Sequence, residues 1–124
     1  MTDDTVLPPE VRRLINETLE SMDHVELLFR IVRKGEATAE WLAQDAHVDR
    51  NQVAQVLKDL ERAKLLIAAD GVYRVTTSAR ERAAVELFAD TYNARPVTLI
   101  RAVYARPSSV RSFANAFRLR GGTE

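Results

Sequence analysis

The chain of 124 residues has no cysteine, only four glycines and four prolines, and no long apolar run. Without cysteine, disulfides, thiolate metal sites and thiol nucleophiles are excluded. So few glycines and prolines argue against a fibrous or low-complexity chain. No apolar run approaches the ~20 residues of a membrane span, and the acidic start is unlike a signal peptide. We therefore expect a cytoplasmic protein that does not bind membranes.

Catalytic and metal-binding patterns are missing as well. The glycines stand too far apart for a phosphate-binding loop or a nucleophile elbow. The two histidines, His24 and His47, fall in different predicted elements and lack the spacing of zinc ligands. We expect no enzyme activity, no metal and no cofactor.

Net charge is zero, because 18 basic residues balance 18 acidic ones. This balance argues against a basic protein that coats nucleic acid without specificity. The charges are unevenly distributed: residues 1–30 hold seven acids and three bases, whereas residues 91–124 hold six arginines and one glutamate. Three interpretations stay open: a salt-bridged seam within the chain, a basic face for a partner, or arginines spread over solvated helices.

Apolar residues make up 46% of the sequence, which suffices for one core. Pro8-Pro9-Glu10 is typical of a helix start, and apolar residues follow at helical spacing to about Ser21. Asp23-x-x-Glu26 has the form of a capping box and predicts a second helix. Gly35, after a basic last turn, predicts its end.

The middle of the chain predicts a helix-turn-helix unit followed by a hairpin. Thr38 is a suitable N-cap for a short helix over Ala39–Ala46, and Asp49 for a longer one from Arg50 to Lys64. Asp70-Gly71 separates two β-prone runs, residues 65–69 and 72–75, which favours a two-residue type I′ turn.

Helices are also predicted after the hairpin. Ser78-x-x-Glu81 is a second capping box, and it predicts a helix to about Ala94. Pro96 predicts the start of the next helix, and Ser108 caps a last one. That last helix carries an apolar stripe at positions i, i+3, i+4 and i+7, namely Val110, Phe113, Ala114 and Phe117.

Three stretches of this segment have a recognisable pattern: AEWLA over residues 39–43, NQVAQVLKDLERAKLL over 51–66, and YRVTTSAR over 73–80. Together they resemble the MarR and ArsR type of bacterial winged-helix regulators over about residues 23–94. The second stretch resembles the family's recognition helix and the third its passage out of the wing. The sequence departs from the family at Ala79, where glycine is usual, and at Gln55, where a basic residue is frequent.

The resemblance implies a mainly α, winged helix-turn-helix fold, with a three-helix core and a short β-hairpin wing. We expect a flexible start over residues 1–8, one domain over 9–120 and a loose tail over 121–124. Within the domain, the winged-helix core spans 23–76, flanked by helical extensions over 9–21 and 78–120. The implied function is a sequence-specific, non-catalytic transcriptional regulator. The alternative is a winged-helix adaptor that binds a protein and not DNA.

Double-stranded DNA is the first expected partner. With the apolar side of the 50–64 helix turned inward, its polar side chains face outward, and such side chains hydrogen-bond base edges and phosphates. The competing interpretation is that this side of the helix is a solvated surface of mixed charge. The predicted wing is short, and Asp70 at its tip would repel the phosphates of DNA. The candidate DNA-binding residues are Arg50, Asn51, Gln52, Gln55, Lys58 and Arg74.

A second copy of the chain is the other expected partner, through the terminal helices. Apolar stripes in both helices must be buried, either on the domain's own core or against a partner chain. The last helix, which also carries arginines, could instead contact another protein. The candidate interface residues are Val11, Leu14, Ile15, Val110, Phe113 and Phe117.

Overall fold

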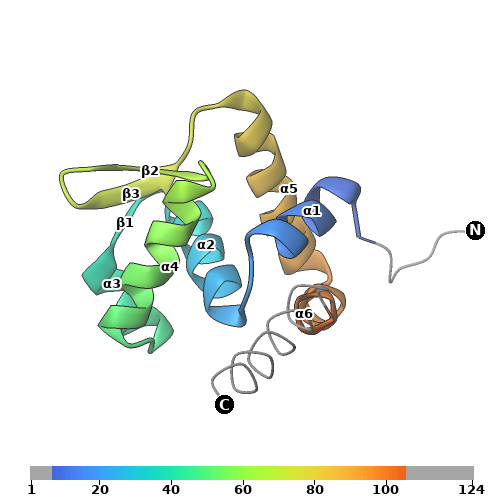
Figure 1. The fold of residues 1–124 in the computed structure, drawn as a ribbon, viewed down its shortest axis with the longest axis horizontal. Helices are drawn as coiled ribbons and strands as arrows, with labels where there is room; N and C mark the ends of the chain where they lie inside the picture. The colour runs from blue at the N-terminus through green and yellow to red at the C-terminus, as the bar shows by residue number, and fades with distance from the viewer. Residues whose placement is uncertain (1–6, 106–124) are drawn as a thin grey trace, which may run out of the picture.

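Helices dominate residues 7–105, the part of the chain that the computed structural model describes (Figure 1). A small three-stranded antiparallel sheet accompanies them. The predicted mainly helical fold with a β-hairpin is therefore confirmed at this level. In chain order the elements are α1 (Pro9–Glu17), α2 (Met22–Lys34), β1 (Ala37–Thr38), α3 (Ala39–Ala46), α4 (Arg50–Arg62), β2 (Leu66–Ala69), β3 (Val72–Val75), α5 (Ala79–Ala94) and α6 (Pro96–Tyr104).

The sheet is built around the predicted hairpin. Leu66 pairs with Val75 across it, and the turn residues Asp70 and Gly71 have φ angles of 55° and 78°, as a type I′ turn requires. The third strand, β1, was not predicted from the sequence, and it adds to the free edge of β3, giving the order β1-β3-β2. Figure 1 shows the hairpin projecting from the helices on the side away from α1 and α6.

Short polar side chains begin the two helices of the helix-turn-helix segment as predicted. Thr38 accepts a hydrogen bond from the backbone N–H of Trp41 at 3.1 Å, and Asp49 accepts one from that of Asn51 at 2.9 Å. Both satisfy N–H groups that have no partner within a first turn. Residues 47–49 connect α3 to α4, and His47 turns the chain with a φ of 56°.

The predicted capping boxes differ from the structure. The N-cap of α2 is Ser21, two residues before the expected Asp23, and its hydroxyl accepts from the backbone N–H of His24. Glu26 bonds side chains elsewhere instead of closing a box. At α5 the Ser78 hydroxyl donates to the Glu81 carboxylate, which lowers the pKa of Glu81, and it caps no backbone N–H.

Three predicted boundaries also shift. Helix α1 ends at Glu17 rather than near Ser21, and Leu19 is fully buried in the turn that follows. Helix α4 ends at Arg62, because Lys64 takes a positive φ of 68°. Leu7, expected in a flexible start, is buried against the core. Residues 1–6 and 106–124, with the predicted last helix and tail, lie outside the described residues.

One apolar core joins all the helices. Helix α1 packs against α5 and α6, while α4 packs against α2 and α3. None of the helices described over residues 7–105 is both long and apolar enough to cross a membrane. The bulkiest fully buried side chains are those of Phe88, Ile15, Leu19, Leu27, Leu28, Ile31, Leu42, Leu57, Leu60 and Leu99.

Candidate nucleic-acid interface

Helix α4 has one buried and one exposed face, as its sequence predicts. Every one of its inward apolar side chains is at most 1% exposed. On the other face Arg50, Asn51, Gln55 and Lys58 are exposed, and Gln52 is half-buried. Burial of one face fixes the helix, so the direction of the polar side chains is set by packing. The inward residues are Val53, Val56, Leu57 and Leu60.

Most of the candidate side chains on α4 are available for a partner. Within residues 7–105, no hydrogen bond or ion pair engages the side chains of Arg50, Asn51, Gln52 or Lys58. Gln55 differs, because its amide N–H donates to Asp59 Oδ1 at 3.0 Å. Two cations and two amides can thus meet a ligand without first breaking a contact with a described residue.

Asp59 faces the protein more than the solvent. Its Oδ2 accepts from His24 Nε2 at 2.9 Å, and its side chain is 20% exposed. Glu61 on α4 and Asp49 at its N-cap are exposed acids, and Arg62 lies 3.8 Å from Asp59 Oδ1. The exposed face is therefore of mixed charge, and Arg50 and Lys58 are the bases on it that can contact an anion without first leaving a described acid.

The hairpin offers a weaker contact. Arg74, the candidate on β3, is half exposed but forms an ion pair with Glu36 at 2.8 Å. Asp70 adds a negative charge at the tip of the same hairpin. A phosphate at Arg74 has to compete with Glu36, so the structure brings Arg74 to the surface without leaving it free.

The N-terminal half of the predicted dimer interface lies inside the chain. Val11, Leu14 and Ile15 are at most 8% exposed, since α1 packs on α5 and α6. Their assignment to an interface is thus corrected: they fill the domain's own core and leave little area for a second chain. The C-terminal half, Val110, Phe113 and Phe117, lies outside the described residues.

A shallow cavity of about 490 Å³ lies between α2, α3 and α5. Phe29 and Tyr92 meet edge to face in its wall, and the ammonium of Lys34 lies 4.6 Å from the centre of the Trp41 ring. Trp41 is only partly buried, and it packs against the hydrophobic core.

A polar network beside this cavity was not predicted. Glu26 accepts hydrogen bonds from Tyr92 and Arg30, and Arg30 also donates to Asp45 at 2.9 Å. Burial, together with the hydrogen bond to Glu26, raises the pKa of Tyr92 to about 12. The network ties α5 to α2 and α2 to α3.

The bond between His24 and Asp59 was not predicted from the sequence. The spacing of Gln55 and Asp59, four residues apart on one helix, is a signal that could have indicated their bond. His24 lies 35 residues from Asp59, so no local pattern indicates that pair. Among residues 7–105, no group of three or more His, Cys, Asp or Glu side chains could hold a metal ion.

No family model matches this sequence, and a search of curated proteins finds no match either.

Proposed function

We propose that residues 23–76 form a winged helix-turn-helix and that the chain is a sequence-specific, non-catalytic DNA-binding regulator of the cytoplasm. The proposal extends the resemblance to the MarR and ArsR regulators. One observation carries it: α4 holds Arg50, Asn51 and Lys58 exposed and free of other described side chains, on a helix whose opposite face is buried. Such a helix fits the major groove.

The order of the elements supports the same function. Helix α3 and a three-residue turn precede α4, and the hairpin follows it directly. In a winged helix the second helix of this unit enters the major groove, and the hairpin reaches the backbone beside it. In this chain Asn51 and Gln55 would read bases, while Arg50 and Lys58 would hold phosphates.

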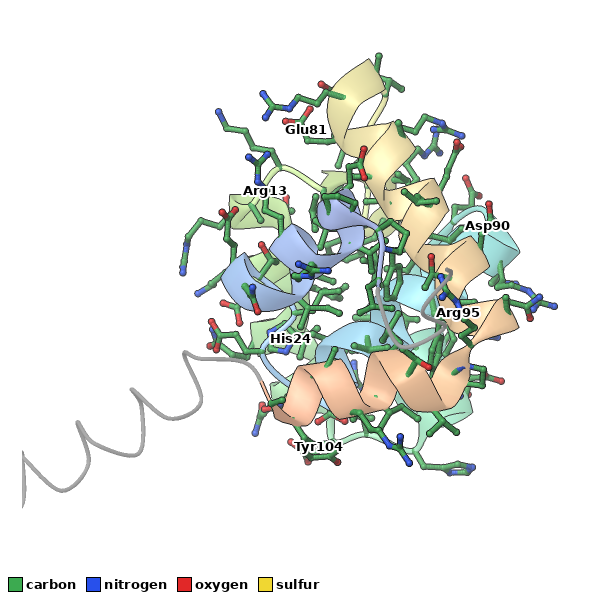
Figure 2. All side chains as sticks on the ribbon, turned by 90° about the vertical axis from the view of Figure 1, so that its right-hand side faces the viewer. Arg13, His24, Glu81, Asp90, Arg95 and Tyr104 are labelled. Carbon is green, nitrogen blue, oxygen red and sulfur yellow. The ribbon has the colours of Figure 1, made fainter. Side chains whose placement is uncertain are left out.

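Fluorescence anisotropy with labelled genomic duplexes, at low and moderate salt, tests the proposal. We expect the double variant Arg50→Glu/Lys58→Glu to bind at least about tenfold more weakly than wild type, because two phosphate contacts become repulsive. Arg13→Glu is the control, since Arg13, labelled in Figure 2, is an exposed base on α1 and is not one of the candidate DNA-binding residues. Equal losses in both variants would contradict a DNA site on α4.

The alternative is an adaptor that binds a protein. The Arg74–Glu36 ion pair and Asp70 favour it, because both weaken a phosphate contact at the wing. So does the exposed apolar surface of α6, where Val97 and Tyr104 are 58% and 72% exposed. A chain that binds no duplex even at low salt would favour the adaptor.

We also propose a homodimer through the C-terminal part of the chain. Val97 and Tyr104 are seven residues apart on α6 and therefore lie on one side of it, and Figure 2 shows Tyr104 pointing away from the domain. The apolar stripe Val110–Phe117 follows in the sequence. A two-fold dimer would present two copies of α4 to successive major grooves, ~34 Å apart.

A further inference from the structure

The buried histidine on α2 is unusual because both of its ring nitrogens are engaged. His24 is 5% exposed, with Nδ1 2.8 Å from Ser21 Oγ and Nε2 2.9 Å from Asp59 Oδ2 (Figure 2 labels His24). An ionised carboxylate only accepts hydrogen bonds, so Nε2 carries the proton that bridges to Asp59. A buried polar ring with both nitrogens satisfied holds its partner in one place.

Asp59 connects this ring to the exposed face of α4. One carboxylate oxygen faces His24, while the other accepts from the side-chain amide of Gln55 at 3.0 Å. Arg62 also approaches this second oxygen, at 3.8 Å. The chain His24–Asp59–Gln55 therefore runs from the core to the surface proposed to contact bases.

The contact with Asp59 decides which way the Gln55 amide points. Because the carboxylate cannot donate, the NH₂ group and not the carbonyl of Gln55 must face it. One N–H is used in this bond, which leaves one N–H and the carbonyl oxygen for a ligand. One donor beside one acceptor matches the N7 and N6–H₂ edge of adenine, whereas guanine presents two acceptors.

We propose that Asp59, anchored by His24, is a positioning residue that orients the Gln55 amide so that it selects adenine over guanine. This inference rests on the proposed function, because it assumes that Gln55 meets a base. Neither His24 nor Asp59 touches DNA in this scheme. Asp59 disfavours the flipped orientation of the Gln55 amide, because the carbonyl oxygen would then face the carboxylate. In that orientation both N–H groups would point to the base and would suit the two acceptors of guanine.

The test is selection and sequencing of bound duplexes from a random pool, with the full chain. The double variant His24→Leu/Asp59→Leu removes the donor and the acceptor of their bond together, and the half-buried Ser21 hydroxyl still accepts from the backbone N–H of residue 24. Glu61→Gln is the matched control: it removes one carboxylate from α4 without touching Gln55. Gln55→Ala identifies the base pair that Gln55 reads.

We expect wild type and Glu61→Gln to favour adenine over guanine at that base pair by about tenfold, as one good bidentate contact allows. In the double variant the preference should fall to within about twofold, because an amide that Asp59 no longer holds can also flip and present its two N–H groups to the two acceptors of guanine. An unchanged adenine preference in the double variant, or a guanine preference in wild type, would overturn the inference and leave the proposed function intact. A wild-type chain that enriches no sequence would contradict both.

A second measurement needs no DNA. The ¹⁵N–¹H signal of the Gln55 side-chain amide, identified by its loss in Gln55→Ala, should move in the double variant toward the position of exposed Gln44. The Gln44 signal itself should stay where it is, because no described side chain bonds it. A Gln55 signal that is the same in wild type and double variant would show that Asp59 does not hold the amide, and would overturn the inference.

Discussion

At the scale of single residues, the polar side chains of α4 divide into two classes by what they can recognise. Asn51 carries a donor and an acceptor, which suit a base edge, whereas Lys58 carries only a charge, which suits any phosphate. Both are exposed and unengaged by other described residues. Specific and nonspecific binding should therefore respond differently to the two residues.

We expect Asn51→Ala to cost about 1–3 kcal/mol on the preferred duplex and to relax sequence preference. Lys58→Ala should weaken all duplexes alike and reduce the salt slope by about one unit. Anisotropy titrations on a selected and a scrambled duplex, across a salt series, measure both effects. Equal losses on the two duplexes for Asn51→Ala would remove its role in base reading.

Glu36 is expected to limit the contribution of Arg74. Since the pair is half exposed, it adds little to stability, and Glu36→Gln should leave the fold intact. The freed guanidinium should then strengthen binding to every duplex, by about twofold to fivefold at low salt, and steepen the salt dependence. In the Arg74→Ala background the same change should have a smaller effect, because no guanidinium is left to release. An equal gain in both backgrounds would exclude the pair as the cause.

At the scale of helices and strands, the sequence correctly predicted most helix caps and the hairpin turn, because residues close together in the chain determine these features. Thr38, Asp49 and Gly35 mark helix ends as expected, and Asp70-Gly71 forms the turn that its residues favour. The predicted start of α2 was wrong because Ser21 and Asp23 are both good N-cap residues. The buried ring of His24 bonds the Ser21 hydroxyl, and this bond favours Ser21 as the N-cap.

Features that depend on distant residues could not be read from the sequence. Strand β1 has two residues and no periodicity, and it exists because β3 offers an open edge. Gln55 and Arg74 were placed correctly at the surface, but their partners Asp59 and Glu36 become visible only with the fold. The sequence could predict that these side chains are exposed, but it could not predict that Asp59 and Glu36 already bond them.

The bond between Tyr92 and Glu26 should stabilise the attachment of α5 to α2. Tyr92→Phe removes the hydroxyl and should lower the free energy of unfolding by about 1 kcal/mol near neutral pH. A pKa raised from 10.0 to about 12 in the folded protein means that this contribution is present below pH 10 and is lost as pH rises toward 12.

Urea unfolding of wild type and Tyr92→Phe, followed by circular dichroism, checks this prediction. The difference between the two proteins should be largest at about pH 8 and clearly smaller at about pH 11. Thr98→Ala, on the half-buried side of α6, serves as a control with no phenol to titrate. A difference that is the same at both values of pH would contradict the role of the hydroxyl.

At the scale of the whole molecule, the described core is complete without a second chain, because α1 of the same chain packs against α5 and α6. We therefore assign the proposed dimer contact to the C-terminal part of the chain. Phe113→Glu or Phe117→Glu should dissociate it more than Arg111→Ala or Arg118→Ala, because burying a phenylalanine contributes roughly 1.5–3 kcal/mol and an exposed ion pair about 0–1.

Light scattering across a concentration series measures this directly. Wild type should approach the mass of two chains, and removal of residues 108–124 should give one. A wild-type mass of one chain at high concentration would contradict the dimer. A dimer that survives the deletion would move the interface to another surface.

We propose that α4 and the hairpin together form the DNA-binding surface. Titration of ¹⁵N-labelled protein with a selected duplex, followed by ¹⁵N–¹H correlation spectra, locates the residues that contact the duplex. We expect the amide signals that move to lie in residues 49–58 and 70–75, with those of α1 nearly unchanged. Signals that move mainly in α6, or that do not move at all with saturating duplex, would contradict it.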